Sequence, residues 1–164
     1  MIQRIQTVLL AVAAIASVAV VFIPIGTIVD TLHNNVALYE YGAFSLKECQ
    51  DGIVGNGVLS TVYVALIWIA SAILSVVTIF MYKNRQRQIR LNNVNMVVML
   101  AAIVVMLYVY PNLVFEAREY VTPNFILNFN YWIAISLIPA ISIFFANSAI
   151  KRDEKKVRAA DRLR

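Results

Sequence analysis

The two residue types that ligate most zinc ions and supply many catalytic nucleophiles are nearly missing from this chain. Its 164 residues include a single cysteine, Cys49, and a single histidine, His33. One cysteine cannot close an internal disulfide, and one cysteine with one histidine is too few for most zinc sites. The sequence also lacks the Cys-x-x-Cys, His-Glu-x-x-His, Gly-x-Ser-x-Gly and phosphate-loop motifs. We therefore expect a protein that is not an enzyme and that holds no metal or cofactor.

Charged residues are absent from four long apolar runs, which contain no Asp, Glu, Lys or Arg. They cover residues 7–29, 57–82, 94–110 and 125–150. Each is long enough, or nearly so, to cross a hydrocarbon core of about 30 Å as a helix, and a segment in lipid must satisfy its own backbone hydrogen bonds. A proton relay is not expected, since the polar residues of these runs are uncharged. The sequence predicts an all-α integral membrane protein of one domain, in which four transmembrane helices form an antiparallel bundle.

Basic residues are unevenly distributed among the segments that connect the runs. Of the 14 Lys and Arg, only Lys47 and Arg118 follow the first or the third run; the others lie at the N-terminus, in residues 83–90 or in a tail at residues 151–164. The positive-inside rule therefore places both termini and residues 83–90 in the cytoplasm. The same asymmetry explains most of the sequence pI of about 9.5, so nucleic-acid binding is not expected.

The fourth run has no proline or glycine near its end, and its helix is expected to continue into the cytoplasm as a basic helical tail. Glu154 and Arg158 support this prediction, because they are spaced i,i+4 with the acid first, the order that stabilises a helix.

The first outer loop, residues 30–56, is the longest connection. Its aromatic and β-branched residues predict a short strand or β-hairpin at the membrane surface. Tyr39, Tyr41 and Phe44 are typical of an interfacial aromatic belt, with a ligand-binding cap as the alternative. Cys49 is expected to be an unpaired thiol covered by this loop, with an intermolecular disulfide or a redox-sensitive thiol as the alternative.

Two features of the runs concern helix packing. Small residues recur at helical spacing along the second run, at Gly57, Thr61, Ala65, Ala72 and Ser75. Such a stripe allows close approach of helices, and we expect it to pack inside the bundle; a docking face for another membrane subunit is the alternative. Prolines lie inside the first and fourth runs, at Pro24 and Pro139, and each is expected to kink its helix.

Three segments resemble an uncharacterised membrane family of Bacteroidota, described as domain of unknown function 4293. They are Met1–Thr7, Tyr82–Leu91 and Ala149–Arg164. The resemblance extends over essentially the whole chain and is weakest in the outer loops. It implies four helices in the inner membrane of a Gram-negative bacterium. It implies no established activity, so no catalytic residue is transferred to this chain.

All three segments lie on the cytoplasmic side in the topology above, which is typical of a docking protein. Our leading hypothesis is a non-catalytic accessory subunit of a larger inner-membrane complex, for protein translocation, envelope biogenesis or respiration. The candidate partner-binding residues are Arg85, Arg87, Arg90, Arg158, Asp161 and Arg162. One alternative is a small lipid- or quinone-binding protein or transporter with a site near Pro24, Asn128 and Pro139. Another is contact between the basic tail and anionic lipid headgroups or the ribosome.

Overall fold

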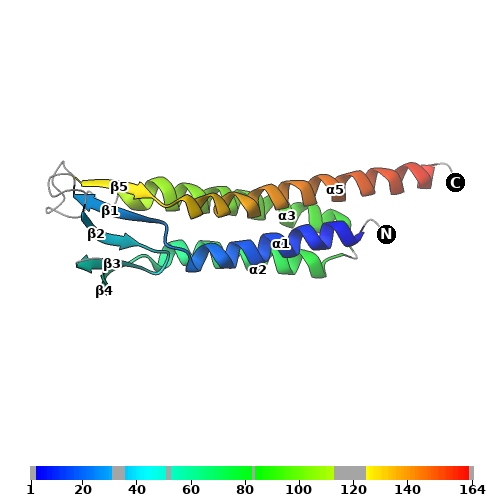
Figure 1. The fold of residues 1–164 in the computed structure, drawn as a ribbon. Coiled ribbons are helices and arrows are strands. Elements are labelled where there is room, and N and C mark those ends of the chain that lie inside the picture. The colour runs from blue at the N-terminus through cyan, green and yellow to red at the C-terminus, as the bar shows by residue number, and fades with distance from the viewer. Residues whose placement is uncertain (1–2, 31–35, 51–52, 83, 113–124, 163–164) are drawn as a thin grey trace.

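The computed structural model describes residues 3–30, 36–50, 53–82, 84–112 and 125–162. It shows a bundle of long helices with a small β-sheet at one end and both chain termini at the other (Figure 1). We call these the sheet end and the terminal end. The connection between the second and third helices also lies at the terminal end.

In the described part of the chain, four helices are long and apolar enough to cross a membrane. They are α1 (Gln3–Phe22), α2 (Val62–Phe80), α3 (Arg85–Val104), which continues as the π-helical turn η1 (Val105–Val109), and α5 (Leu137–Arg162), which follows the 3₁₀ helix η2 (Tyr131–Ser136). Contacts join α1 to α2, α2 to α3, α3 to α5 and α5 to α1. The helices therefore form a closed ring in which each packs between two antiparallel neighbours.

The expectation of an all-α protein is wrong, because the sheet end is a five-stranded antiparallel sheet. Its strands are β1 (Gly26–Asp30), β2 (Val36–Tyr41), β3 (Ser45–Gln50), β4 (Ile53–Ser60) and β5 (Phe125–Phe129), in the order β4-β3-β2-β1-β5. The expected hairpin in the first outer loop is present as β2 and β3. The sheet is larger than expected because β1 and β5 were assigned to helices.

The outer ends of three predicted runs are strands rather than helix. Residues 26–29 belong to β1, residues 57–60 to β4 and residues 125–129 to β5. Apolar, β-branched residues are compatible with a buried strand as well as with a helix in lipid, so hydropathy alone does not separate the two. β1 pairs with β2 on one side and along its whole length with β5 on the other, and these two ladders supply hydrogen-bond partners for its backbone.

Neither proline lies in the middle of an α-helix. Pro24 follows the end of α1 at Phe22, because the residue before a proline is disfavoured in the helical region. Pro139 is buried at the third position of α5, where the change from 3₁₀ to α-helical geometry takes place. A missing N–H in the first turn costs little, since those groups have no α-helical partner.

α3 begins nine residues before the start predicted for the third run. Its N-cap is Asn84, whose side-chain oxygen accepts a hydrogen bond of 3.2 Å from the Arg87 backbone N–H. Residues 85–90 are therefore helix and not a loop. The prediction was wrong because charged residues end a hydrophobic run without ending a helix.

Two buried tyrosines attach the sheet to the bundle. The Tyr41 hydroxyl donates to the Met106 carbonyl in the π-helical turn at 3.2 Å, and the Tyr110 hydroxyl donates to the Ser60 carbonyl at 3.1 Å. Their rings stack with centroids 5.4 Å apart. Burial, and secondarily the neighbouring Tyr110, raise the pKa of Tyr41 well above its ordinary value, so its hydroxyl stays a donor. Tyr41 is thus a core residue and not part of an interfacial belt.

Most of the small-residue stripe on α2 packs inside the bundle, as expected. Thr61, Ala65, Ala72 and Ser75 are all buried, whereas Gly57 lies exposed in β4. The same face of α2 carries Trp68, the largest fully buried side chain. Small residues on either side of Trp68 let neighbouring helices close around the indole ring.

Candidate functional site

Exposed basic side chains gather on two elements at the terminal end. We call this set the basic terminal surface; it consists of Arg87 and Arg90 on α3 and of Lys151, Arg152 and Lys155 on α5. The two helices contact each other. The first turn of α3 contains no acidic residue, so its arginines add to the partial positive charge of the helix N-terminus instead of cancelling it. This surface favours contact with negative charge or with carbonyl oxygens.

Arg85 starts α3 and is half-buried rather than part of the exposed surface. Its Nη1 atom is buried and has no hydrogen-bond partner among the residues that the structure describes. A guanidinium nitrogen in this position retains its capacity to donate. Arg85 therefore differs from Arg87 and Arg90, with which the sequence grouped it.

The other three candidate residues, Arg158, Asp161 and Arg162, lie in the last turns of α5. Their side chains are outside the described part of the structure. The helix itself continues to Arg162, as predicted, and reaches about 18 Å past Ile150. Figure 1 shows α5 extending beyond the other helices. The candidate residues are thus divided between the start of α3 and a projecting helix.

A buried contact ties the tail to the N-terminal helix. The Gln6 side-chain amide on α1 donates to the Asp153 carboxylate on α5, and both residues are buried. The two residues belong to two of the three segments that carry the family resemblance. Sequence reasoning missed this pair. The available signal was the spacing of Asp153 three residues after Ile150, on the same helix face.

Polar side chains also fill the interface between α2 and α3. Asn95 accepts a hydrogen bond from Ser71 Oγ at 2.6 Å and donates to Ser75 Oγ at 2.8 Å. Gln88 donates to the Thr78 carbonyl at 3.2 Å. Such bonds join helices where a neighbouring lipid chain offers no partner.

On its other side, α3 reaches α5 through neighbouring asparagines. Asn92 donates to the Ile143 carbonyl at 3.2 Å, and Asn147 donates to Asn93 Oδ1 at 2.7 Å. The buried Oδ1 atoms of Asn92 and Asn147 have no partner among the described residues.

The spacing on α3 could have revealed these polar residues. Its buried residues follow one another at steps of three and four, namely Gln88, Asn92, Asn95, Met99 and Ala102. Because the hydropathy pattern predicts that the third helix starts at residue 94, the first two of these residues fall outside the predicted helix.

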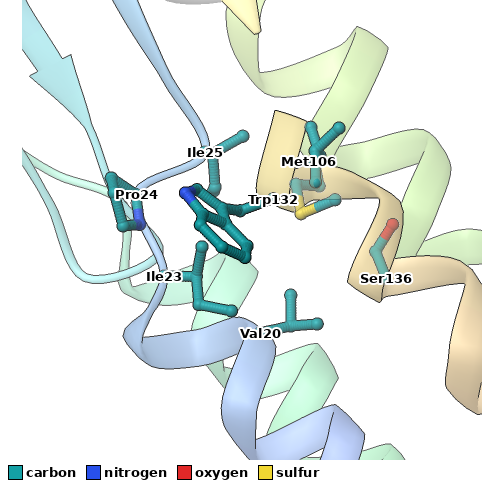
Figure 2. Close-up of a pocket in the computed structure, with 8 residues that line it drawn as sticks. Val20, Ile23, Pro24, Ile25, Met106, Trp132 and Ser136 are labelled. Carbon is teal, nitrogen blue, oxygen red and sulfur yellow. The ribbon is translucent and has the colours of Figure 1, made fainter. Parts of the chain in front are cut away.

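A small hollow lies at the sheet end between α1 and η2 (Figure 2). In Figure 2 the Trp132 ring lies between Pro24 on one side and Met106 and Ser136 on the other. The hollow has a volume of about 10 Å³, which suits a water-sized molecule and not a lipid headgroup or a quinone ring. Asn128 is outside this hollow and pairs with Thr27 in the sheet. The three residues named for a ligand site are therefore not gathered around one cavity.

A larger hollow, of about 220 Å³, lies between the end of α1 and the β2–β3 hairpin. Its lining includes Phe22, Phe44 and the oppositely charged Glu40 and Lys47. Within the described residues, no group of three or more His, Cys, Asp or Glu is placed to hold a metal ion. This hollow is the roomier of the two and combines charged with apolar walls.

Cys49 is a buried thiol in β3, as the sequence predicted. Burial, and secondarily the Glu40 carboxylate, raise its pKa, while a hydrogen bond with the Glu40 backbone acts in the opposite direction. A raised pKa in the folded chain favours the neutral thiol, so this contribution to stability is present below the ordinary thiol pKa and is lost as the pH rises through the folded value.

We expect Cys49 in the native protein to react with an alkylating reagent at neutral pH at least about tenfold more slowly than in the SDS-unfolded chain. Burial limits the access of the reagent to the thiol, and the raised pKa lowers the fraction of reactive thiolate. The rate should increase as the pH rises. Alkylation followed by mass spectrometry measures it. A Glu48→Cys, Cys49→Ser variant places the thiol at an exposed neighbouring position and should react quickly. Equal rates at the two positions would contradict the burial of Cys49.

The described part of the chain defines a class: a mostly helical protein in which four helices are long and apolar enough to cross a membrane and a small antiparallel sheet lies at one end. The family described as Domain of unknown function (DUF4293) matches residues 2–163, so the chain belongs to this family. A search of curated proteins finds no significant match.

Proposed function

We propose that the protein spans the bacterial inner membrane four times, with the terminal end in the cytoplasm and the sheet outside it. The outer faces of the helices support this, because they expose large apolar side chains such as Ile15, Leu66, Val97 and Phe145. Apolar surface of this extent is unfavourable in water and is normal in lipid. The basic terminal surface supports the orientation through the positive-inside rule.

Exposed aromatic residues at both ends of the bundle support the same placement. Tyr63 and Phe80, at the two ends of α2, are 71% and 75% exposed. They are about 26 Å apart along the helix, close to the thickness of a hydrocarbon core. Tyr108 and Trp132 are also exposed near the sheet end. Aromatic rings at these two levels fit the two interfaces of a bilayer.

Within that membrane, we propose a non-catalytic accessory subunit that docks onto a larger complex through its terminal end. One observation carries the proposal: α5 continues to Arg162, nine residues past Asp153, which is the last residue of α5 that is buried among the side chains that the structure describes. A short charged helix is only marginally stable in water without a packing partner. The extension and the basic terminal surface would bind acidic side chains or helix C-terminal carbonyls of a partner in translocation, envelope biogenesis or respiration.

Charge reversal at the end of α5 tests the docking role. Arg158→Glu with Arg162→Glu should lower the amount of co-purified partner about tenfold or more, because like charges facing each other across an interface cost several kcal/mol. Arg158→Lys with Arg162→Lys is the matched control and should keep most of the partner. A protease digest of spheroplasts checks that insertion is unchanged. Undiminished recovery of the partner with the reversed variant would count against docking through this helix.

A lipid or quinone binder remains the second candidate, and the 220 Å³ hollow is the observation that favours it. That hollow lies at the sheet end and not between the helices. A transport route through the bundle has less support, because buried polar residues such as Asn95 and Ser71 bond to each other.

A further inference from the structure

The hollow between α1 and the β2–β3 hairpin, which we call the hairpin groove, has two kinds of wall. One wall is the end of α1 with the residues that follow it, Val21 to Pro24. The other is formed by hairpin residues that include Glu40, Ser45 and Lys47. Its volume of about 220 Å³ is several times the share of one water molecule, about 30 Å³, and is less than a drug-sized ligand requires. It suits a small polar group.

An acid and a base face this groove from opposite strands. Glu40 on β2 and Lys47 on β3 are register partners, and so are the next pair, Tyr41 and Leu46. Tyr41 and Leu46 are buried in the core. Since successive side chains of a strand point to opposite faces, Glu40 and Lys47 point away from the core, towards the groove. A ligand that carries both an ammonium and a phosphate would match these two charges.

The end of α1 adds a second acceptor for an ammonium group. Pro24 has no N–H, and the N–H of Ile25 donates to the Tyr41 carbonyl at 2.8 Å. In a continued helix the same N–H would bond to the carbonyl of Val21, which therefore loses its helical donor. Carbonyls at a helix C-terminus carry partial negative charge and attract cations. Glu40 and the C-terminal end of α1 therefore both favour a positively charged group in the groove.

The groove opens onto an apolar track along α1. Phe22 and Phe44 contact each other beside it, with ring centroids 6.2 Å apart. Below Phe22, the side chains of Val18 and Ile15 are exposed at helical spacing on the outside of α1. If α1 crosses the membrane as proposed, residues 21–24 lie at the level of the lipid headgroups and this track lies in the acyl-chain region.

We propose that the hairpin groove binds the headgroup of an amine-bearing zwitterionic phospholipid, of the phosphatidylethanolamine type. The ammonium group donates to the Glu40 carboxylate and the end of α1, the phosphate pairs with Lys47, and an acyl chain lies along Ile15 and Val18. A trimethylammonium headgroup donates no hydrogen bond, and an anionic headgroup without an amine is repelled by Glu40, so both bind more weakly. The proposal rests on the proposed membrane insertion but not on docking to a partner.

Native mass spectrometry of the full chain in a neutral detergent tests the proposal. Phosphatidylethanolamine, phosphatidylcholine and phosphatidylglycerol are added at equal concentration, and the fraction of protein that retains each lipid is measured. We expect preferential retention of phosphatidylethanolamine. Glu40→Gln should lower this retention about five- to tenfold, the effect of one charge-assisted hydrogen bond at a partly solvated site. Glu48→Gln is the matched control. Glu48 follows Lys47 in the hairpin and does not line the groove, so this variant should leave the retention of phosphatidylethanolamine unchanged.

Three results would overturn the proposal: equal retention of phosphatidylcholine, equal effects of Glu40→Gln and Glu48→Gln, or binding of soluble phosphoethanolamine as tight as that of the lipid. The last result would assign the groove to a soluble ligand. An alkaline wash of the membranes separates this failure from failure of the proposed function. A chain that stays in the washed membranes but shows no lipid preference rejects the groove alone. A chain released by the wash rejects the membrane placement on which the groove depends.

Discussion

Replacing Trp68 with alanine is expected to lower the free energy of unfolding by about 3–5 kcal/mol, the usual cost of removing a large aromatic side chain from a core. Trp68 is 0% exposed and belongs to the apolar cluster that includes Val64, Met99 and Met106. The small residues beside it on α2 fit the helices around the indole. The cavity left by alanine could close only if the helices moved together.

A Trp68→Phe variant separates packing from hydrogen bonding. The indole Nε1 is buried without a hydrogen-bond partner among the described residues. Phenylalanine removes that unpaired donor and keeps most of the ring volume, so we expect a loss of only about 1 kcal/mol. Titration with SDS in mixed micelles, followed by circular dichroism, measures both variants. If Trp68→Phe destabilised as much as Trp68→Ala, the indole N–H would have a bonding role that the structure does not show.

Replacing Gln6 with leucine is expected to destabilise the protein by about 2–3 kcal/mol, because it leaves a buried carboxylate without its hydrogen-bond donor. Gln6 donates to Asp153, which is 8% exposed. The penalty arises from the unpaired charge and not from the lost contact alone. The double variant Gln6→Leu, Asp153→Leu should therefore be more stable than the single variant Gln6→Leu, since both polar partners are then gone.

Gln86→Leu is the matched control for this prediction, because Gln86 is an exposed glutamine at the same end of the bundle. It should change the free energy of unfolding, measured by the same SDS titration, by less than about 0.5 kcal/mol. A double variant that is no more stable than Gln6→Leu would show that the Asp153 carboxylate is solvated or paired elsewhere.

The four apolar helices and the helical tail were predictable because their signals are local. Length and hydropathy identify a segment that must satisfy its own backbone bonds, and the segment after Ile150 lacks any residue that ends a helix. The terminal end was predictable for the same reason. Its basic residues cluster in the sequence at the start of α3 and in the second half of α5, so no long-range contact was needed to group them.

The sheet could not be assigned from local sequence, because its pairing is distant. β1 pairs with β5, and Gly26 lies opposite Phe129. Nothing within residues 125–129 distinguishes a strand that finds this partner from the start of a helix in lipid. The hairpin groove depends on the same kind of information: Glu40 and Lys47 become neighbours through the strand register, and α1 reaches them only because it ends at Phe22.

The start of α3 shows a third reason for disagreement. The charged and amide side chains of residues 85–93 suggested a loop, yet one face of this segment is buried against α2 and α5. Outside the hydrocarbon core a helix can expose arginines on one side and bury Gln88 and Asn92 on the other. Helical spacing of the amides was the signal, and a hydropathy average hides it.

Purification of the chain from its own membranes tests the central claim, docking through the terminal end, most directly. An affinity tag placed in the connection between β1 and β2 leaves the basic terminal surface and the end of α5 unaltered. After extraction in mild detergent, mass spectrometry identifies the proteins that remain bound and their stoichiometry. The account predicts one membrane complex in stoichiometric amount, lost with Arg158→Glu, Arg162→Glu and kept with the lysine variant. Recovery of the protein alone, under conditions that preserve other membrane complexes, would contradict it.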